Sequence, residues 1–204
     1  MRGSDLLAEM LVREGVETIF TLMSEEITSF TATLRTRWDD EVDVVQTRHE
    51  QSAVAMADGY ARTGGEIGVA AVGRGPAVAQ TGTALVTAQK SGSDVLVVVP
   101  ERPRAATVDH LNKEFRQQSY LETLVDTVLS VRSEDAFVPK LADAFFRLHN
   151  GDGPVVVQIP WDLLDSEVGG TDDWQRKLDE ARQRTASDAR LHPERAGIRE
   201  AVDL

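Results

Sequence analysis

The chain has 204 residues, which is enough for one sizeable domain with its own hydrophobic core. It contains no cysteine, so disulfide frameworks and thiolate metal sites are excluded, and this fits a cytoplasmic location. The formal net charge of −12 argues against nucleic acid as a partner, because phosphate binding needs clustered Lys and Arg. The sequence also shows no apolar stretch of about 20 residues, so we expect no membrane partner.

Six short runs rich in β-branched residues predict six strands, at 18–22, 42–46, 67–72, 95–99, 127–131 and 154–159. Most of these runs are apolar at consecutive positions, which is typical of strands covered on both faces of a parallel sheet. Segments with helical periodicity lie around them, near 4–14, 25–37, 50–63, 77–91, 113–124 and 134–149. The alternation predicts an α/β fold, a three-layer α/β/α sandwich with a six-stranded parallel sheet.

The character of the sequence changes after residue 165. Residues 1–165 form the expected domain, and the charged stretch 166–191 is expected to be a linker or a surface helix. The last residues, 192–204, read "HPERAGIREAVDL" and begin a new amphipathic pattern that stops unfinished. We expect them to open a further, central domain that is truncated here.

The loops that follow the strands are the expected place for a ligand. In an open parallel sheet, ligands bind beyond the carboxyl ends of the strands. Four of these loops carry polar or glycine-rich sequences: "TLMSEE", "QTRHEQ", "VGRGPAVAQ" and "VPERPR". A functional site is therefore expected where these four loops meet.

Four segments carry a family resemblance. They read "GVETIF", "RHEQSAVAMADGYARTGG", "GRGPAVAQTGTALVTAQKSGSDVLVVVPE" and "GPVVVQIPWDLL". In order and spacing the chain resembles, over about residues 4–165, the N-terminal pyrimidine-binding (PYR) domain of thiamine-diphosphate-dependent enzymes. The acetolactate synthase and 2-keto-acid decarboxylase group is the most similar.

The resemblance implies a cofactor, a reaction and partners. The cofactor is thiamine diphosphate with Mg²⁺, and its diphosphate and metal would be held by a domain not present in this chain, which itself has no metal site. The implied reaction is decarboxylation of a 2-keto acid, possibly with carboligation. The implied partner is a second copy in a homodimer or higher oligomer, or a separate diphosphate-binding subunit.

Glu50 is the residue that the resemblance singles out for catalysis, because it matches the glutamate that contacts N1′ of the aminopyrimidine. A carboxyl group that shares a proton with N1′ favours the 4′-imino tautomer, whose nitrogen can remove the thiazolium C2 proton. The alternative is a first-turn acidic residue favoured by the helix macrodipole. Small side chains along the same helix indicate a close-packed interface; they are Ala53, Ala55, Ala57, Gly59 and Ala61.

The loop "VGRGPAVAQ" supplies further candidate residues. Gly73, Gly75 and Pro76 allow a tight turn close to a cofactor ring. Gln80 matches a position that is commonly Asn in the family and is either a cofactor contact or an ordinary helix glutamine. Arg74 has two interpretations: it clamps a carboxylate or phosphate if it points into the cleft, or it is a solvated loop cation.

Two other segments are candidates for contact with substrate. "TLMSEE" has no glycine where relatives often carry a glycine-proline-glycine turn, so Ser24 and Glu25 would line the substrate pocket. Gln117 lies where relatives carry a pocket glutamine, although an amphipathic surface helix would also explain it. The altered loop leaves activity itself open, so the alternatives are a non-catalytic PYR-like interaction module and the alpha subunit of a split decarboxylase.

One apparent motif is expected to be a simple turn. Residues 151–153 read "GDG", which opens the diphosphate and Mg²⁺ site in this family, but no Asn follows at the required distance of about 25 to 30 residues. A nucleotide-binding domain of another class is set aside as well, because the first strand is not followed by a glycine-rich fingerprint.

Overall fold

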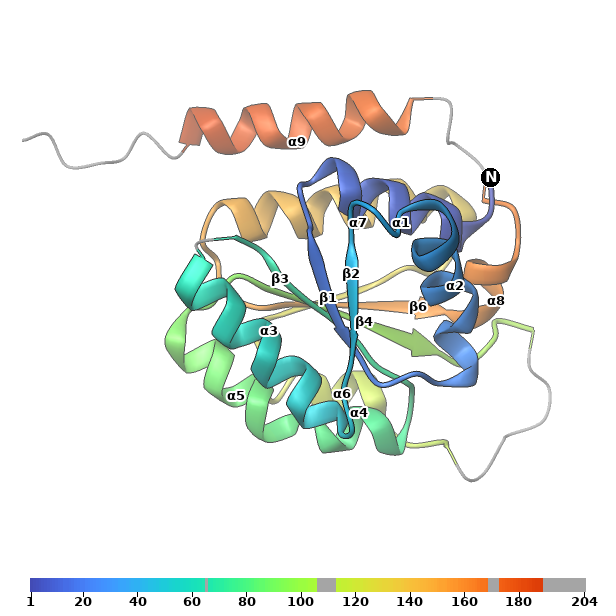
Figure 1. Cartoon of the computed structure of the whole chain (residues 1–204), viewed down its shortest axis with the longest axis vertical. Coiled ribbons are helices and arrows are strands. Elements are labelled where there is room, and N and C mark those ends of the chain that lie inside the picture. The colour runs from blue at the N-terminus through green and yellow to red at the C-terminus, as the bar shows by residue number, and fades with distance from the viewer. Residues whose placement is uncertain (65, 106–112, 169–172, 189–204) are drawn as a thin grey trace, which may run out of the picture.

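The computed structural model describes residues 1–64, 66–105, 113–168 and 173–188 (Figure 1). Within them, six parallel strands form one sheet in the order β2-β1-β3-β4-β6-β5. The strands are β1 (Thr18–Thr21), β2 (Asp43–Gln46), β3 (Gly68–Ala71), β4 (Val95–Glu101), β5 (Thr127–Ser130) and β6 (Val155–Pro160). The predicted six-stranded parallel sheet is therefore confirmed.

Helices cover both faces of the sheet (Figure 1). One layer contains α3 (Glu50–Gly64), α4 (Pro76–Gln80), α5 (Gly82–Ser91) and α6 (Gln117–Leu121). The other contains α1 (Gly3–Arg13), α2 (Thr28–Arg37), α7 (Glu134–His149) and α8 (Trp161–Asp165), with the short 3-10 helix η1 (Glu25–Ile27) before α2 and with α9 (Trp174–Asp188) outside α7. This arrangement is the predicted three-layer sandwich.

The core has two apolar clusters, one on each face of the sheet. Phe30, Phe137 and Phe145 lie fully buried in the larger cluster, while valines and alanines make up most of the other. Strands β3, β4 and β6 are buried along nearly their whole length, which explains their unbroken apolar runs. In the described part of the chain, no helix is long and apolar enough to cross a membrane.

The small residues of α3 face two ways. Ala53, Ala57 and Ala61 are buried against the sheet. A methyl group at Gly68 of β3 would lie 2.0 Å from the carbonyl oxygen of Ala57, so helix and strand approach too closely for any larger residue. Ala55 and Gly59 point outward and are exposed. Contact with the sheet therefore explains only three of the five small residues, and the other two remain available to a partner.

The helix expected over 77–91 is divided in two. Thr81 separates α4 from α5, and its hydroxyl group donates a hydrogen bond to the carbonyl of Val78 (2.7 Å). The hydroxyl group of Tyr120 donates to the carbonyl oxygen of Ala79 (3.0 Å), and a methyl group at Gly82 would lie 2.3 Å from that hydroxyl oxygen. A side chain from α6 therefore occupies the break.

The helix expected over 113–124 is much shorter than predicted. Only Gln117–Leu121 are helical, as α6. The preceding residues lie instead on the glycine turn after β3, since a methyl group at Gly75 would be 2.3 Å from the carbonyl oxygen of Lys113. Gly75 has φ 68°, a conformation that favours glycine. Contact with this turn replaces the first helical turn that the periodicity predicted.

The charged stretch after residue 165 contains α9. Trp174 and Leu178 are buried in the larger core cluster, and α9 packs on α7. Asp179 pairs with Arg13 of α1 at 2.9 Å. A linker or a surface helix was expected for this stretch, and Trp174–Asp188 form a helix. Residues 192–204, for which the start of a further domain was expected, lie outside the described residues.

Candidate functional site

The sheet has a topological switch point between β1 and β3, because β2 lies on one side of β1 and β3 on the other. Loops diverge there and leave room for a ligand beyond the strand ends. Ser24 follows β1 and Gly73 follows β3, and a methyl group at Gly73 would lie 3.0 Å from the Ser24 side chain. The structure thus brings these two predicted site residues together.

Glu50 is the first residue of α3, and its side chain is half-buried. The loop that leads to it is anchored to the end of β1, because the backbone N–H of Thr47 donates to the carbonyl of Thr21 (2.7 Å). His49 is exposed, and its Nδ1 accepts a hydrogen bond from the backbone N–H of Gln51 (3.2 Å). His49 therefore caps the helix, while Glu50 stands at the carboxyl edge of the sheet.

Gln117 points inward from α6 and joins three elements. Its Nε2 donates to the carbonyl oxygen of Pro100 and to Oε1 of Gln158, both at 3.0 Å. Its Oε1 accepts from the backbone N–H of Gly75 (3.0 Å). Gln158 is fully buried in β6. Gln117 lines the pocket described below, and its side chain fixes the glycine turn to the ends of β4 and β6, whereas contact with substrate stays a prediction.

Arg74 is buried between carboxylates of its own chain. Only 6% of its side chain is exposed. Its Nη1 donates to Oε1 of Glu114 (2.9 Å), and its Nε lies 3.4 Å from Oε1 of Glu26. Lys113 also pairs with Glu26. The arrangement matches neither sequence interpretation fully, because the guanidinium is turned inward but is already paired. We call Glu26, Arg74, Lys113 and Glu114 the charge cluster.

Glu26 is the most buried carboxylate of the charge cluster. Burial by itself raises the pKa of Glu26, but hydrogen bonds from Lys113, from its own backbone N–H and from Ser24 outweigh burial and hold the pKa below its ordinary value. Glu26 was not among the site residues predicted from the sequence. The helical period contained the signal, because Glu26 precedes the buried Phe30 and Leu34 by one and two turns.

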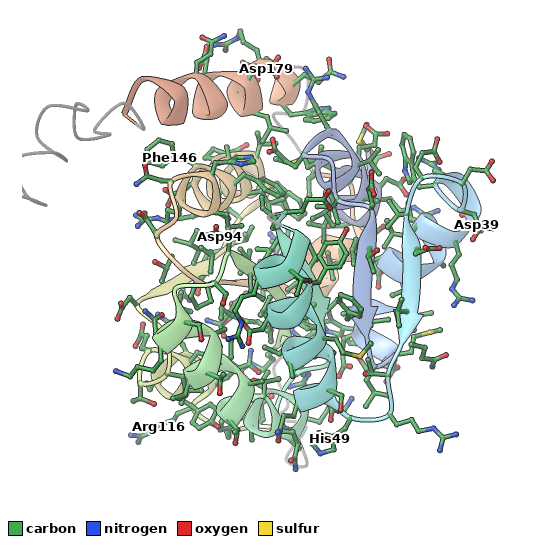
Figure 2. All side chains as sticks on the ribbon, turned by 60° about the vertical axis from the view of Figure 1, so that its left-hand side comes forward. Asp39, His49, Asp94, Arg116, Phe146 and Asp179 are labelled. Carbon is green, nitrogen blue, oxygen red and sulfur yellow. The ribbon has the colours of Figure 1, made fainter. Side chains whose placement is uncertain are left out.

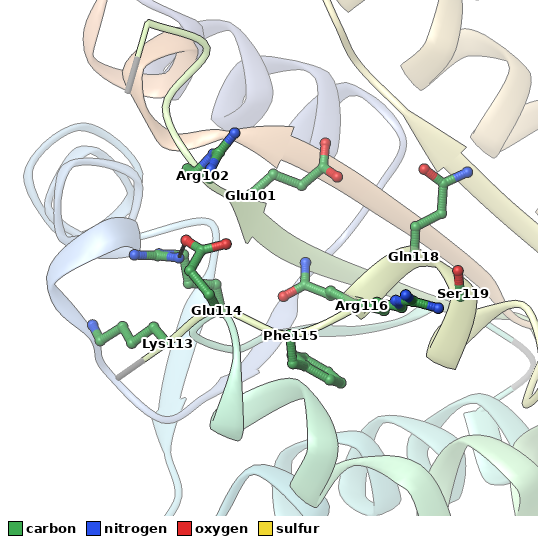
Figure 3. Close-up of a pocket in the computed structure, with 10 residues that line it drawn as sticks. Glu101, Arg102, Lys113, Glu114, Phe115, Arg116, Gln118 and Ser119 are labelled. Carbon is green, nitrogen blue, oxygen red and sulfur yellow. Dashed lines mark hydrogen bonds and ion pairs between the residues drawn. The ribbon is translucent and has the colours of Figure 1, made fainter. Parts of the chain in front are cut away.

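A pocket of about 280 Å³ opens beside the charge cluster (Figure 3). Four cationic side chains and two carboxylates line it: Arg74, Arg102, Lys113, Arg116, Glu101 and Glu114. Figure 3 shows Glu101 and Arg102 on one side and the segment from Lys113 to Ser119 on the other. Burial raises the pKa of Glu101, and Arg132 opposes this rise in part. In Figure 2, His49 and Arg116 lie at the same end of the molecule.

The other predicted site residues lie outside this pocket. Glu25 is exposed on η1, and Pro76 and Gln80 are exposed at the two ends of α4. Glu50 does not line the pocket either, although α3 contacts α4. Two neighbouring regions therefore stand at the carboxyl edge of the sheet: Glu50 with the exposed side of α4, and the pocket with the charge cluster.

The described residues contain no group of three or more His, Asp or Glu side chains that could hold a metal ion. The "GDG" sequence forms a turn between α7 and β6, and its two glycines have positive φ, 75° at Gly151 and 87° at Gly153. Because this turn precedes β6, it lies at the amino edge of the sheet, away from Glu50.

Comparison with known proteins identifies the family of the chain. The family model described as "Thiamine pyrophosphate enzyme, N-terminal TPP binding domain" matches residues 1–126. The 2-hydroxyacyl-CoA lyase 2 of Homo sapiens is 34% identical over 170 residues, covering 79% of this chain and 25% of the relative. Glyoxylate carboligase of Escherichia coli O157:H7 is 33% identical over 175 residues, covering 82% and 28%.

A probable acetolactate synthase large subunit of Methanocaldococcus jannaschii is 27% identical over 169 residues, covering 82% of this chain and 28% of the relative. The chain thus spans about a quarter of the length of these curated relatives. The family model covers more than half of the chain, and the resemblance noted from the sequence is confirmed. The chain belongs to the N-terminal TPP-binding domain family of thiamine pyrophosphate enzymes.

Proposed function

We propose that this chain supplies the pyrimidine-binding half of a thiamine-diphosphate-dependent enzyme that cleaves or forms carbon–carbon bonds, with a 2-keto acid as substrate. Membership of the family supports the cofactor. The relatives are named as a lyase, a carboligase and a synthase, which supports this class of reaction. The observation that carries the proposal is the position of Glu50, a half-buried carboxylate on the first turn of α3 at the carboxyl edge of the sheet.

The residues around Glu50 fit a cofactor ring. When bound, thiamine diphosphate supplies the nucleophilic carbon and the electron sink for the reaction. Glu50 would be the residue that shares a proton with a ring nitrogen of the bound cofactor. Pro76 and Gln80 are exposed on the neighbouring α4 and remain open to the ring. Gly73 and Gly75 act indirectly, because Ser24 and Lys113 already occupy the space beside them.

The partner is expected on the outward face of α3 and α5, which we call the pairing face. Its exposed apolar side chains are Met56 and Val86, 42% and 40% exposed. Ala55 and Gly59 beside Met56 leave room for another backbone. Since Glu50 begins α3, a partner on this face would stand next to it. This supports a second copy of the chain, or a separate diphosphate-binding subunit that also brings Mg²⁺.

The test is Glu50→Gln in the complete enzyme, assayed with thiamine diphosphate and Mg²⁺. We expect kcat/KM to fall by about 10²- to 10⁴-fold, the usual contribution of a positioned proton donor or acceptor. Thermal unfolding and circular dichroism should stay unchanged. Glu41→Gln is the control, because Glu41 is exposed before β2, at the opposite edge of the sheet. Equal rates for wild type and Glu50→Gln would refute the proposal.

The substrate panel decides between neighbouring functions. It contains pyruvate and longer 2-keto acids, with 2-hydroxyacyl-CoA added because of the lyase relatives. Turnover of the thioester alone would move the assignment to that lyase reaction. No turnover across the panel would favour the non-catalytic interaction module that the altered "TLMSEE" loop allows.

A further inference from the structure

The pocket beside the charge cluster is cationic in an acidic chain. The chain has 34 acidic and 22 basic residues, yet the pocket lining contains four cations and two carboxylates. Burial raises the pKa of Glu101, one of these two carboxylates, which favours its neutral form. A cleft lined with an excess of one charge attracts ligands of the opposite charge. The lining therefore favours an anionic ligand.

The two carboxylates that pair with Arg74 differ in how firmly they are held. The Glu26 side chain is 3% exposed and is shared with Lys113, so its removal would leave two cations without their buried counter-charge. The Glu114 side chain is 29% exposed and contributes only one hydrogen bond to Arg74. It belongs to the segment before α6, at the border of the pocket. Glu114 is therefore the partner of Arg74 that can be exchanged.

We propose that Arg74 is the carboxylate-binding group of the substrate pocket, and that Glu114 occupies it as an internal competitor that the carboxylate of a 2-keto acid displaces. The proposal rests on the proposed function, in that it takes this pocket as the substrate pocket. Exchange of one carboxylate for another keeps the charge of the cluster balanced. The guanidinium can bind the incoming carboxylate through two parallel hydrogen bonds.

Hydrogen bonds already hold the backbone beside Arg74 in place before a substrate binds. Gln117 accepts a hydrogen bond from the N–H of Gly75 and ties the turn to β4 and β6. Oε1 of Glu26 lies 3.4 Å from Nε of Arg74, so the guanidinium still faces one carboxylate when Glu114 leaves. Substrate binding then requires only that the partly exposed side chain of Glu114 be released to solvent. Figure 3 shows Glu114 beside Lys113 on the segment that borders the pocket.

The experiment is a titration of this chain with pyruvate, followed by isothermal titration calorimetry, which gives an apparent Kd for wild type and for every variant. If Glu114 occupies Arg74 about nine-tenths of the time, Glu114→Gln should lower the apparent Kd about tenfold. The double variant Glu114→Gln with Arg74→Lys should lose this gain, because a lysine cannot make the two parallel bonds. Glu122→Gln, an exposed change on the C-cap of α6, should bind like wild type.

Two further ligands test whether the carboxylate group of pyruvate is the source of the gain in affinity. Methyl pyruvate is neutral at the corresponding position and should bind no more tightly to Glu114→Gln than to wild type. A gain with inorganic phosphate but not with pyruvate would overturn the proposal, as would an unchanged Kd for pyruvate. The titration needs neither cofactor nor turnover, so its failure is distinct from a failure of the Glu50→Gln assay.

Discussion

At the scale of single residues, Glu26 shows how one buried charge can fix three loops. It joins the segment after β1 to Arg74 after β3 and to Lys113 before α6. Its pKa is held below the ordinary value, so the folded chain keeps it ionised at a pH where the unfolded chain takes up a proton. Its contribution to the free energy of unfolding is therefore complete above the unfolded pKa, about 4.3, and disappears as the pH falls through the lowered folded value.

Glu26→Gln should therefore destabilise the chain in a pH-dependent way. At pH 7 we expect the free energy of unfolding to fall by about 3 kcal/mol, the lower end for removal of one partner from a buried ion pair. The difference from wild type should shrink as urea unfolding is repeated at successively lower pH, below about 4.3. Glu25→Gln, an exposed change next to it, should have almost no effect. A difference that stays constant with pH would show that Glu26 acts without its charge.

At the scale of helices and strands, local sequence patterns predicted most of the fold. Each strand depends on its own run of apolar residues, so the predicted 18–22 and 127–131 differ from Thr18–Thr21 and Thr127–Ser130 by one residue. The failures arise where distant contacts decide the backbone. The helix predicted at 113–124 is shortened because Lys113 lies on the glycine turn.

The same distinction holds for the candidate site. The sequence could place four site residues together, because each of them follows a strand or matches a family position. They are Ser24, Gly73, Arg74 and Gln117. The ion pairs within the charge cluster could not be predicted from the sequence, since Lys113 and Glu26 are 87 residues apart in the sequence. The hydrophobic periodicity within a single helix or strand gives no information on a contact over such a separation.

The contact between α3 and β3 allows a test at the scale of elements. Gly68→Ala should lower the free energy of unfolding by about 1–3 kcal/mol, because its methyl group would press on the carbonyl oxygen of Ala57. Gly59→Ala is the matched variant on the outward side of α3, where no atom lies within 4 Å. It should stabilise the chain by about 0.5–1 kcal/mol through helix propensity. Urea unfolding measures both, and similar values would contradict the close approach of α3 to the sheet.

At the scale of the whole molecule, the pairing face differs in charge from the chain as a whole. The chain carries a net charge of −12, but the pairing face on α3 and α5 exposes mainly small, apolar and uncharged side chains around Met56 and Val86. Glu50 stands at the beginning of this same α3. Association and cofactor activation would therefore depend on one surface, and a partner docked on it would exclude water beside the carboxylate.

Met56→Glu tests this link by placing a charge at the centre of the pairing face. A buried, unpaired carboxylate is costly, so the variant should remain monomeric in sedimentation experiments under conditions where wild type self-associates. Met23→Glu is the control, because Met23 is 44% exposed but lies outside α3 and α5. Circular dichroism should be the same for all three proteins. If Met56→Glu and wild type have the same mass at every concentration, self-association through this face is refuted, and the separate diphosphate-binding subunit becomes the partner to test against the same variant.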